Sequence, residues 1–256
     1  TQYFIGDFDG KTFTSDTDAS GRIPTKWMDF GKDHYATVSW SGTPQNRRTV
    51  IGWMSNWQYA AEVPTTQYRS ANTLPRDLSL FRAPDGEIYL ASAPAAELTA
   101  LRGTLAAKAK KATAGKKPRV FELHAPQRGI CEILLDIDAR KADSVSIDIT
   151  NKAGERVALT YNPAAHTLAF GRRNSGLKDF SKDFPAVTVA PTFENGRKIS
   201  LRIFIDRSSI EVFGNNGHFV STNLVFPTQP YSKLSVTSHG GSTKISNLNI
   251  FSIKEQ

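Results

Sequence analysis

Short runs of alternating polar and apolar residues, separated by turn dipeptides, dominate this sequence and indicate strands rather than helices. Asp9-Gly10 separates Y-F-I-G-D-F from K-T-F-T, and Asp85-Gly86 separates L-S-L-F-R-A-P from E-I-Y-L-A-S. Both are signatures of a β-hairpin, the first with a type I′ turn, because glycine tolerates the positive φ that such turns require. Only A-A-E-L-T-A-L-R has helical spacing. We therefore predict an all-β fold.

The composition changes along the chain and predicts two parts. All four tryptophans precede residue 58, whereas the later sequence is rich in Val, Ile, Leu and Thr. Its strands follow one another at the short, regular spacing of a β-sandwich. We predict an aromatic β unit at 1–97, a basic connector at 98–117 and a sandwich at 118–256. The hairpins of the first unit are typical of blades from a larger radial β array.

The excess of positive over negative charge is concentrated in and just after the predicted connector. The net charge is +8, and seven basic residues occur between Glu97 and Glu122 without an acidic one. They are Arg102, Lys108, Lys110, Lys111, Lys116, Lys117 and Arg119. A nucleic-acid-binding face would interleave aromatic residues with basic ones, and the run from Leu105 to Arg119 contains no aromatic residue. We expect a solvated linker or loop and no nucleic-acid partner; an anionic partner is the alternative.

Several classes of chemistry lack support in the sequence. No apolar run reaches the roughly 18–20 residues of a membrane span, so we expect no membrane insertion. The single cysteine, Cys131, lies in the apolar pattern I-C-E-I-L-L-D-I and is expected to be a buried, inert thiol. The five histidines are scattered without metal-ligand spacing, so we expect no metal. The sequence has no P-loop and no G-x-G-x-x-G motif, and we expect no organic cofactor either.

Carboxylates and aromatic rings remain, and this combination suits sugars. Two carboxyl groups flanking a glycosidic bond can hydrolyse it. The candidates in the first unit are Asp29, Asp33, Glu62 and Asp77. Spacing alone pairs none of them as acid and nucleophile. Asp29 can instead cap a turn before Gly31, and Asp77 can pair with Arg76. For Asp33, at the start of the run Y-A-T-V-S-W, a cap and a site residue are equally open.

Several long motifs, in order along the chain, carry a resemblance to a known family. They are T-Q-Y-F-I-G-D-F-D-G-K-T-F, W-M-D-F-G-K-D-H-Y-A, I-G-W-M-S-N-W-Q-Y-A and L-R-I-F-I-D-R-S-S-I-E-V-F-G-N-N-G. Together they resemble glycoside hydrolase family 32, the β-fructosidases: invertases, levanases and inulinases. The resemblance implies an all-β fold in which the last blades of a five-bladed β-propeller precede a C-terminal β-sandwich.

The resemblance also implies that the catalytic groups lie elsewhere. The family takes its nucleophile from N-D-P-N-G, a stabilising aspartate from R-D-P and its acid/base from E-C. Here Asp77 is followed by Leu78, and Cys131-Glu132 reverses the last motif. We expect the C-terminal portion of a retaining β-fructosidase acting on fructans (levan, inulin) or sucrose, without catalytic residues of its own. An N-terminal partner chain would carry the missing blades.

The same resemblance assigns substrate-binding residues. Asp33, His34 and Tyr35 would form part of the fructose pocket, with Asp33 accepting hydrogen bonds from sugar hydroxyls. His34 stands where the family usually has Phe or Tyr, beside the acid/base. The remaining candidates are Asn56, Trp57 and Trp53. Arg69 and Arg76 are expected to hold loops through carbonyl groups.

The decapeptide at 51–60, I-G-W-M-S-N-W-Q-Y-A, combines two expected environments. T-V-I-G-W-M is typical of a buried strand, in which Gly52 permits close packing and Trp53 belongs to the core. S-N-W-Q-Y-A then leaves the strand end, where binding loops commonly lie. We expect Trp57 to stack on the fructosyl ring with support from Trp53.

An extracellular or periplasmic location and a bacterial source complete the expectation. A second class of function stays open, namely a non-catalytic accessory or carbohydrate-binding protein with the same fold. The late strand D-R-S-S-I-E-V-F alternates as a packed strand, and the sandwich lacks tryptophan. The predicted sandwich is therefore expected to be structural.

Overall fold

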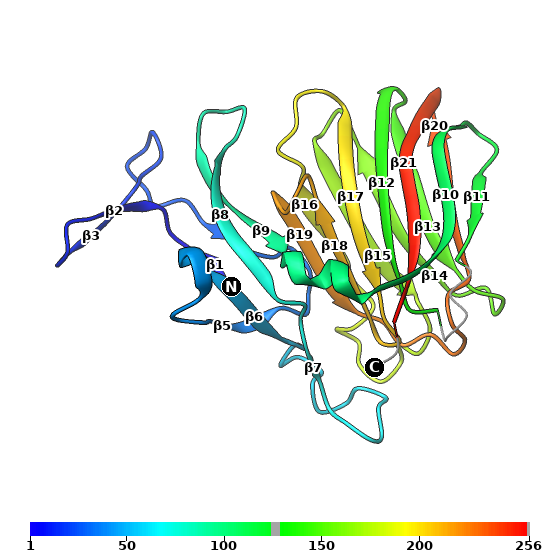
Figure 1. Ribbon diagram of the computed structural model, residues 1–256, viewed down its shortest axis with the longest axis horizontal. Helices are drawn as coiled ribbons and strands as arrows, with labels where there is room; N and C mark the ends of the chain where they lie inside the picture. Colours follow the sequence, from blue (N-terminus) through cyan, green and yellow to red (C-terminus); the bar gives the residue numbers. More distant parts are fainter. Residues whose placement is uncertain (124–128, 255–256) are drawn as a thin grey trace.

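The computed structural model describes residues 1–123 and 129–254, and nearly all of its regular structure is β-strand (Figure 1). Two short 3-10 helices, η1 (Pro44–Asn46) and η2 (Ala96–Leu101), interrupt the strands. The predicted all-β fold is confirmed. Within the described ranges, no helix has the length and apolar character needed to cross a membrane.

A five-stranded antiparallel sheet, made of four longer strands and one two-residue strand, forms a blade beside the sandwich (Figure 1). Its longer strands, in the order β5-β6-β8-β9, are β5 (Tyr35–Ser39), β6 (Thr49–Met54), β8 (Arg76–Arg82) and β9 (Ile88–Pro94). The two-residue strand β7 (Ala71–Asn72) pairs with the end of β6. The four longer strands follow one another in the sheet in their order along the chain, which is the meander of a propeller blade.

Both predicted hairpins form, but neither uses a type I′ turn. Such a turn requires positive φ at both central residues, and here only Gly10 (+95°) and Gly86 (+89°) have it. Pro84 fixes a negative φ in the second turn, where the Gly86 N–H donates to the Ala83 carbonyl at 2.9 Å. In the first, Asp9 Oδ1 accepts hydrogen bonds from two following backbone N–H groups instead. The type I′ prediction for Asp9-Gly10 was wrong, because the hydrogen bonds that the Asp9 side chain accepts from the backbone stabilise a different turn.

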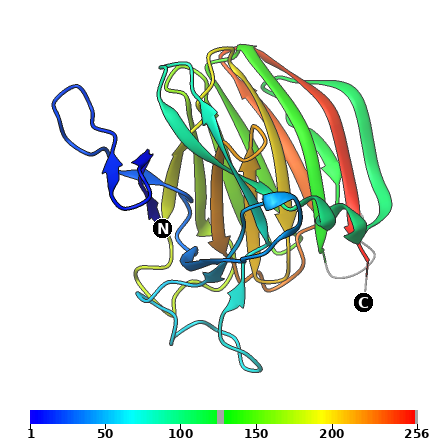
Figure 2. The same cartoon turned by 60° about the vertical axis from the view of Figure 1, so that its left-hand side comes forward.

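The first 27 residues form two small sheets, β1 (Gln2–Tyr3) with β4 (Lys26–Trp27) and β2 (Gly6–Phe8) with β3 (Phe13–Ser15). This N-terminal segment contacts the blade through β1 and β4, where Lys26 Nζ donates to the Ile88 carbonyl at 2.7 Å, whereas β2 and β3 extend away from the blade and sandwich (Figures 1 and 2). Large apolar side chains are exposed here: Phe4, Phe8, Phe13, Ile23 and Trp27. In the part of the chain that the structure describes, no sheet closes into a full propeller.

The C-terminal region is a sandwich of two six-stranded antiparallel sheets. The first comprises β10 (Arg102–Ala114), β21 (Ser242–Ile253), β12 (Cys131–Lys141), β17 (Lys198–Ile205), β18 (Ser209–Gly214) and β19 (Phe219–Leu224). The second comprises β11 (Arg119–Glu122), β20 (Lys233–His239), β13 (Ser144–Thr150), β14 (Arg156–Asn162), β15 (Thr167–Asn174) and β16 (Val187–Pro191). The predicted sandwich, built from strands of period two, is confirmed.

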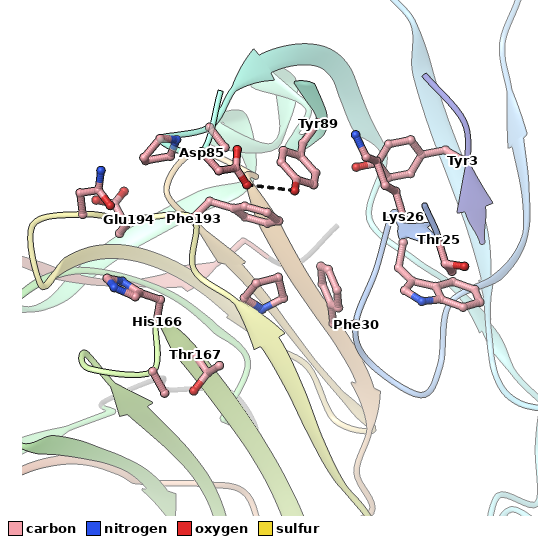
Figure 3. Close-up of a pocket in the computed structure, with 16 residues that line it drawn as sticks. Tyr3, Thr25, Lys26, Phe30, Asp85, Tyr89, His166, Thr167, Phe193 and Glu194 are labelled. Carbon is pink, nitrogen blue, oxygen red and sulfur yellow. Dashed lines mark hydrogen bonds between the residues drawn. The ribbon is translucent and has the colours of Figure 1, made fainter. Parts of the chain in front are cut away.

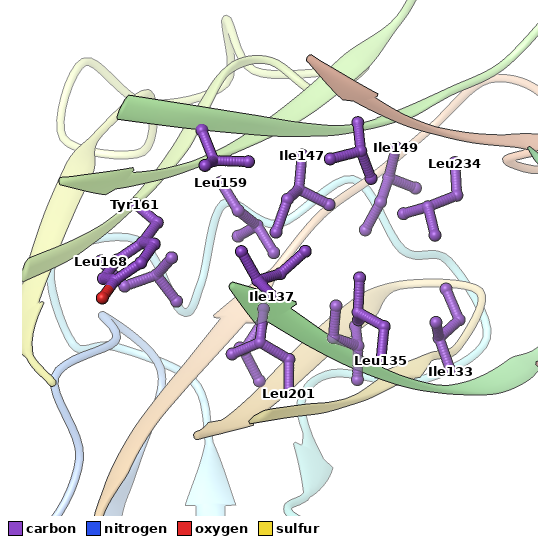
Figure 4. Close-up of a cluster of buried hydrophobic side chains, with 14 of the residues drawn as sticks. Ile133, Leu135, Ile137, Ile147, Ile149, Leu159, Tyr161, Leu168, Leu201 and Leu234 are labelled. Atoms are coloured by element: carbon purple, nitrogen blue, oxygen red, sulfur yellow. The ribbon is translucent and has the colours of Figure 1, made fainter. Parts of the chain in front are cut away.

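Alternate residues of facing strands fill the space between the sheets (Figure 4). Ile133, Leu135 and Ile137 of β12 meet Ile147 and Ile149 of β13, and all five are essentially inaccessible to solvent. Burial of this apolar surface is the main driving force for the sandwich.

The single thiol lies in the same layer. Cys131 is free and fully buried, and burial raises its pKa to about 12. A neutral thiol without access to solvent is unreactive, as predicted.

The basic segment is a strand and not the predicted linker. β10 pairs with β21 over most of its 13 residues and forms one edge of its sheet. Ala109 and Ala112 pack against the core, while Lys108 and Lys110 are exposed. Exposed and more buried residues alternate from Ala107 to Lys110 and, after a change of phase, again from Lys111 to Ala114, and the alanines take the more buried positions. Lysine on an edge strand also opposes pairing with other chains.

A buried ionic cluster joins the blade to the sandwich. Arg76 of β8 is fully buried and donates to Asp29 Oδ2 (2.8 Å) and to Glu211 Oε2 of β18 (2.7 Å). It also donates to the Thr222 hydroxyl of β19 at 2.6 Å. The chain follows β19 so closely at Gly31 that a Cβ there would lie 2.0 Å from the Thr222 carbonyl oxygen. The blade is thus fixed against one end of the first sheet.

Candidate functional site

Three aromatic rings form a continuous surface at one end of the blade, and we call Tyr35, Trp53 and Trp57 the aromatic platform. Tyr35 opens β5 and pairs in register with Trp53 of β6, with ring centroids 6.1 Å apart and planes at 69°. Trp53 in turn contacts Trp57, with centroids at 5.0 Å. Trp57 is 75% exposed and Tyr35 51%, whereas Trp53 is half-buried beneath them. Exposed ring faces of this kind attract the C–H groups of a sugar ring.

A turn at the end of β6 presents Trp57. The Asn56 side chain donates to the Lys32 carbonyl (2.8 Å) and accepts from the Gln58 N–H (3.0 Å), so both of its polar atoms are occupied within the protein. The Tyr59 N–H donates to the Asn56 carbonyl and closes the turn. In this geometry Asn56 orients the loop, and its predicted contact with substrate stays a prediction.

Asp33 lies inside the protein and away from the platform surface. It is fully buried, and its carboxylate accepts hydrogen bonds from the Tyr59 hydroxyl (2.5 Å), Arg172 Nη1 (2.6 Å) and the Leu224 N–H (2.8 Å). A carboxylate with three internal donors and no exposure has no place for a sugar hydroxyl. The structure therefore gives Asp33 a structural role instead of the predicted contact with the sugar.

His34 is buried beneath the blade, with its ring against Gly52 of β6. A Cβ at residue 52 would lie 2.8 Å from His34 Nε2, so glycine is required for this contact, as the sequence suggested. Burial, reinforced by the Arg76 cation and opposed by Asp29, lowers the pKa of His34 to about 4. Its Nε2 atom has no hydrogen-bond partner among the described residues. The ring is therefore neutral near pH 7 and packs as an aromatic side chain.

The other predicted polar residues take structural positions. Asp29 caps the turn at Gly31 as predicted, with Oδ1 2.7 Å from the Gly31 N–H. Arg69 donates to the Val63 carbonyl, also as predicted. Asp77 pairs with Arg47 at 2.6 Å instead of with Arg76. Residues 76 and 77 are neighbours in a strand, so their side chains point to opposite faces of the sheet.

Two residues that the sequence did not single out organise this region. Tyr59 and Arg172 are fully buried and, together with Asp33, form what we call the Asp33–Tyr59–Arg172 cluster. One signal for Arg172 existed, because it follows Leu168 and Phe170 at period two on the buried face of β15. A charged residue in that register requires an internal partner.

A separate cleft of about 430 Å³ lies between the blade and the sandwich (Figure 3). Trp27, Phe30, Tyr89 and Phe193 are among its apolar walls, with Asp85, His166, Glu194 and Asn195 among its polar groups. The Tyr89 hydroxyl donates to Asp85 Oδ2 at 3.2 Å, and partial burial raises the pKa of Glu194. None of the six predicted substrate-binding residues lines this cleft.

The platform can bind and orient a ring but not cleave it. Its indole and phenol groups provide apolar faces and hydrogen-bond donors, whereas hydrolysis by the two-carboxylate route needs an attacking carboxylate and a carboxylic acid. Within residues 1–123 and 129–254, no group of three His, Cys, Asp or Glu side chains is arranged to hold a metal ion. The geometry thus shows an exposed aromatic surface on a blade that is fixed to a β-sandwich.

Comparison with known proteins identifies the family to which this chain belongs. Residues 1–94 match the family described as "Glycosyl hydrolases family 32 N-terminal domain", and residues 97–252 match "Glycosyl hydrolases family 32 C terminal". The chain belongs to glycosyl hydrolase family 32, which confirms the resemblance seen in its motifs.

Individual relatives agree with this assignment. A levanase of Bacillus subtilis is 35% identical over 99% of this chain, which covers 37% of that protein. An extracellular exo-inulinase of Aspergillus awamori is 32% identical over 99% of this chain and 48% of that protein. The chain therefore spans about half the length, or less, of these relatives.

Solved structures show the same fold. The crystal structure of an exo-inulinase from Aspergillus awamori superposes with a TM-score of 0.85 at 30% identity, covering 99% of this chain and 50% of that one. Fructan 1-exohydrolase IIa from Cichorium intybus gives a TM-score of 0.74 over 98% of this chain and 54% of that one. At 18% identity, the second likeness concerns the fold alone. The predicted combination of propeller blades and a C-terminal sandwich is confirmed.

Proposed function

We propose that residues 1–256 are the C-terminal portion of a retaining β-fructosidase that releases terminal fructosyl units from levan, inulin or sucrose. The observation that carries the proposal is the exposed Trp57 face supported by Trp53. It occurs in a chain whose relatives include a levanase and an exo-inulinase. In this role Trp57 stacks on the fructosyl ring, and Tyr35 extends the surface.

The proposed reaction needs two carboxyl groups that lie outside residues 1–256. A carboxylate attacks C2 of the fructosyl unit while a carboxylic acid protonates the leaving oxygen. Water then attacks C2 of the covalent intermediate and gives up a proton to the group that had protonated the leaving oxygen. The attacking carboxylate is released from C2, and fructose leaves. This sequence of steps requires no metal or organic cofactor. The chain contributes binding of the fructosyl ring and exclusion of water from one side of it.

The remaining blades would come from a preceding segment or from an N-terminal partner chain. The exposed apolar side chains of β2, β3 and their surroundings support this, because such a surface is normally covered by protein. The extracellular exo-inulinase among the relatives supports secretion, to the exterior or the periplasm. A bacterial source stays a prediction.

Reconstitution tests the proposal directly. Residues 1–256 are mixed with a separately produced N-terminal half carrying the remaining blades, and fructose release from levan, inulin and sucrose is measured. Hydrolysis that appears only on mixing supports the proposal. A complete protein that releases no fructose from any of the three substrates would overturn it.

A carbohydrate-binding protein without catalysis is a second candidate, favoured by the cleft between blade and sandwich. Trp27 is 48% exposed there, and aromatic walls with free carboxylate and amide groups suit an oligosaccharide. Calorimetric titration of residues 1–256 with fructo-oligosaccharides distinguishes the two. Binding that is lost in Trp27→Ala but kept in Trp57→Ala, without hydrolysis on reconstitution, identifies the binder.

A further inference from the structure

The loop that carries Trp57 is anchored by the sandwich as well as by its own blade. Residues 55–62, here called the platform loop, follow β6 and contain no strand. Tyr59 in this loop is 1% exposed and lies edge-on against Phe184, with centroids at 5.4 Å and planes at 84°. Phe184 belongs to the connection between β15 and β16 of the sandwich. The aromatic ring two residues after Trp57 is therefore part of the interface.

Arg172 of the sandwich completes this anchor. Its Nη2 donates to the Tyr59 hydroxyl at 2.7 Å, and its Nη1 donates to Asp33 Oδ2 at 2.6 Å. Its remaining bonds run to the carbonyls of Phe184 (Nε, 2.7 Å) and Leu224 (Nη1, 2.9 Å). The guanidinium also lies 4.0 Å from the Phe184 ring centroid. Arg172 itself lies on β15, so these carbonyl contacts hold its guanidinium through the sandwich without involving the platform loop.

The cluster holds the platform from both sides. Asp33 precedes Tyr35 by two residues, and Tyr59 follows Trp57 by two, so the two outer rings each have a neighbour bonded to Arg172. The Tyr59 hydroxyl also donates to Asp33 Oδ1 at 2.5 Å and closes the triangle. Fully desolvated, mutually bonded groups of this kind permit little displacement without leaving a charge unpaired.

We infer that Arg172 is a positioning residue for the fructosyl-binding surface, acting through Tyr59 and Asp33 to set the position of Trp57 relative to Tyr35. The inference rests on the proposed function for its consequence in catalysis. It gives the sandwich a specific part in substrate binding, although no sandwich residue belongs to the platform. Loss of the cluster is expected to weaken fructosyl binding while leaving the chemistry of bound substrate nearly unchanged.

The mildest test removes one hydroxyl. Tyr59→Phe keeps the ring and its packing on Phe184 but breaks the bonds to Asp33 and Arg172. The matched control is Thr222→Val, which removes a hydroxyl that buried Arg76 contacts at 2.6 Å in the other interface cluster. Arg172→Lys is a second variant, which keeps the charge but cannot reproduce the forked contacts.

Two readouts separate positioning from stability. The first readout is the circular dichroism of the Trp53–Trp57 indole pair, which reports the geometry of the pair independently of activity. All proteins compared carry Trp27→Phe and Trp40→Phe, so that Trp53 and Trp57 are the only indoles. Kinetics of the complete enzyme report KM and kcat. For Tyr59→Phe we expect a reduced indole couplet and a KM raised about tenfold with kcat nearly unchanged. Thr222→Val should keep the couplet and the KM, and Arg172→Lys should follow Tyr59→Phe.

Each remaining outcome has a definite meaning. An unchanged couplet and unchanged KM in Tyr59→Phe overturn the inference, and so does an equal loss in Thr222→Val. A reduced couplet with unchanged KM upholds positioning of Trp57 but removes the platform from the fructosyl site, so it counts against the proposed function. If Arg172→Lys does not fold, Tyr59→Phe with its control still decides the question.

Discussion

Trp53 and Trp57 lie four residues apart, yet they have different environments because the strand ends between them. Trp53 is on β6 and is half-covered, whereas Trp57 is in the platform loop with three quarters of its surface exposed. An exposed indole backed by another ring is held in one orientation at little conformational cost. That difference is why Trp57 is the residue to test first.

Trp57→Ala in the complete enzyme should cost about 1–3 kcal/mol of transition-state binding, as at other aromatic stacking surfaces. In kcat/KM this is a fall of roughly 5- to 150-fold. Steady-state kinetics on inulin and levan provide the measurement. Trp40→Ala is the control, since Trp40 is an exposed indole outside the platform. A kcat/KM equal to wild type in Trp57→Ala would remove Trp57 from the site.

His34 should make the protein less stable in weak acid. Its pKa falls from 6.5 to about 4 on folding, mainly through burial. Between these values the unfolded chain binds a proton that the folded chain does not, so the free energy of unfolding decreases as the pH falls from 6.5 to 4. The full effect is about 3 kcal/mol.

His34→Phe removes the titrating group and keeps an aromatic ring over Gly52. Urea unfolding at several pH values from 7 to 4 should show a shallower loss of stability in this variant than in wild type. Loss of stability below pH 4 remains in both, because folding lowers the pKa of Asp29 from 3.8 to about 2, so the unfolded chain binds a proton there that the folded chain does not. Identical slopes between pH 6.5 and 4 would show that His34 does not titrate as described.

At the scale of elements, β10 shows how a strand can escape recognition. Its buried face consists of alanines, whose small side chains give a weak hydrophobic signal, and its exposed face consists of lysines. Its partner, β21, lies at the far end of the sequence. The segment becomes a strand because β21 offers an unpaired edge and the core has room for small side chains.

Opposite faces of β10 should respond differently to the same substitution. Ala112 packs on the core, so Ala112→Asp should lower the free energy of unfolding by about 2 kcal/mol or more. Lys110→Asp changes an exposed position and should stay within about 0.5 kcal/mol of wild type. Urea unfolding measures both. Equal, small effects would indicate a linker, contrary to the structure.

At the scale of the whole molecule, two arginine clusters make the blade and sandwich one unit. Arg76 reaches Glu211 and Thr222, and Arg172 reaches Asp33 and Tyr59, so each arginine crosses the interface in the opposite direction. Apolar contacts of Tyr59 and Met54 with Phe184 and neighbours surround the second cluster. The blade is therefore expected to unfold together with the sandwich.

Arg76→Met should cost about 3–5 kcal/mol, because it leaves Asp29 and Glu211 buried without their cation. All four tryptophans precede residue 58, so fluorescence follows the N-terminal part, while far-ultraviolet circular dichroism mainly follows the sandwich. The two transitions should coincide in wild type and separate in Arg76→Met. Coincident transitions at wild-type stability would contradict the role assigned to this cluster.

The sequence alone determined the all-β class, the places of the two hairpins, the division into an aromatic part and a sandwich, and the exit of Trp57 from its strand. These follow from local alternation, turn residues and composition, which need no knowledge of distant partners. Only the tertiary structure decided that Asp33 is an internal ion-pair partner, that β10 is a strand, and that His34 is buried and neutral. Asp33 and Arg172 are 139 residues apart, and no local pattern can show that two such charges meet. The physical reason is that burial and pairing depend on contacts made by folding, while periodicity reports only which face a residue takes.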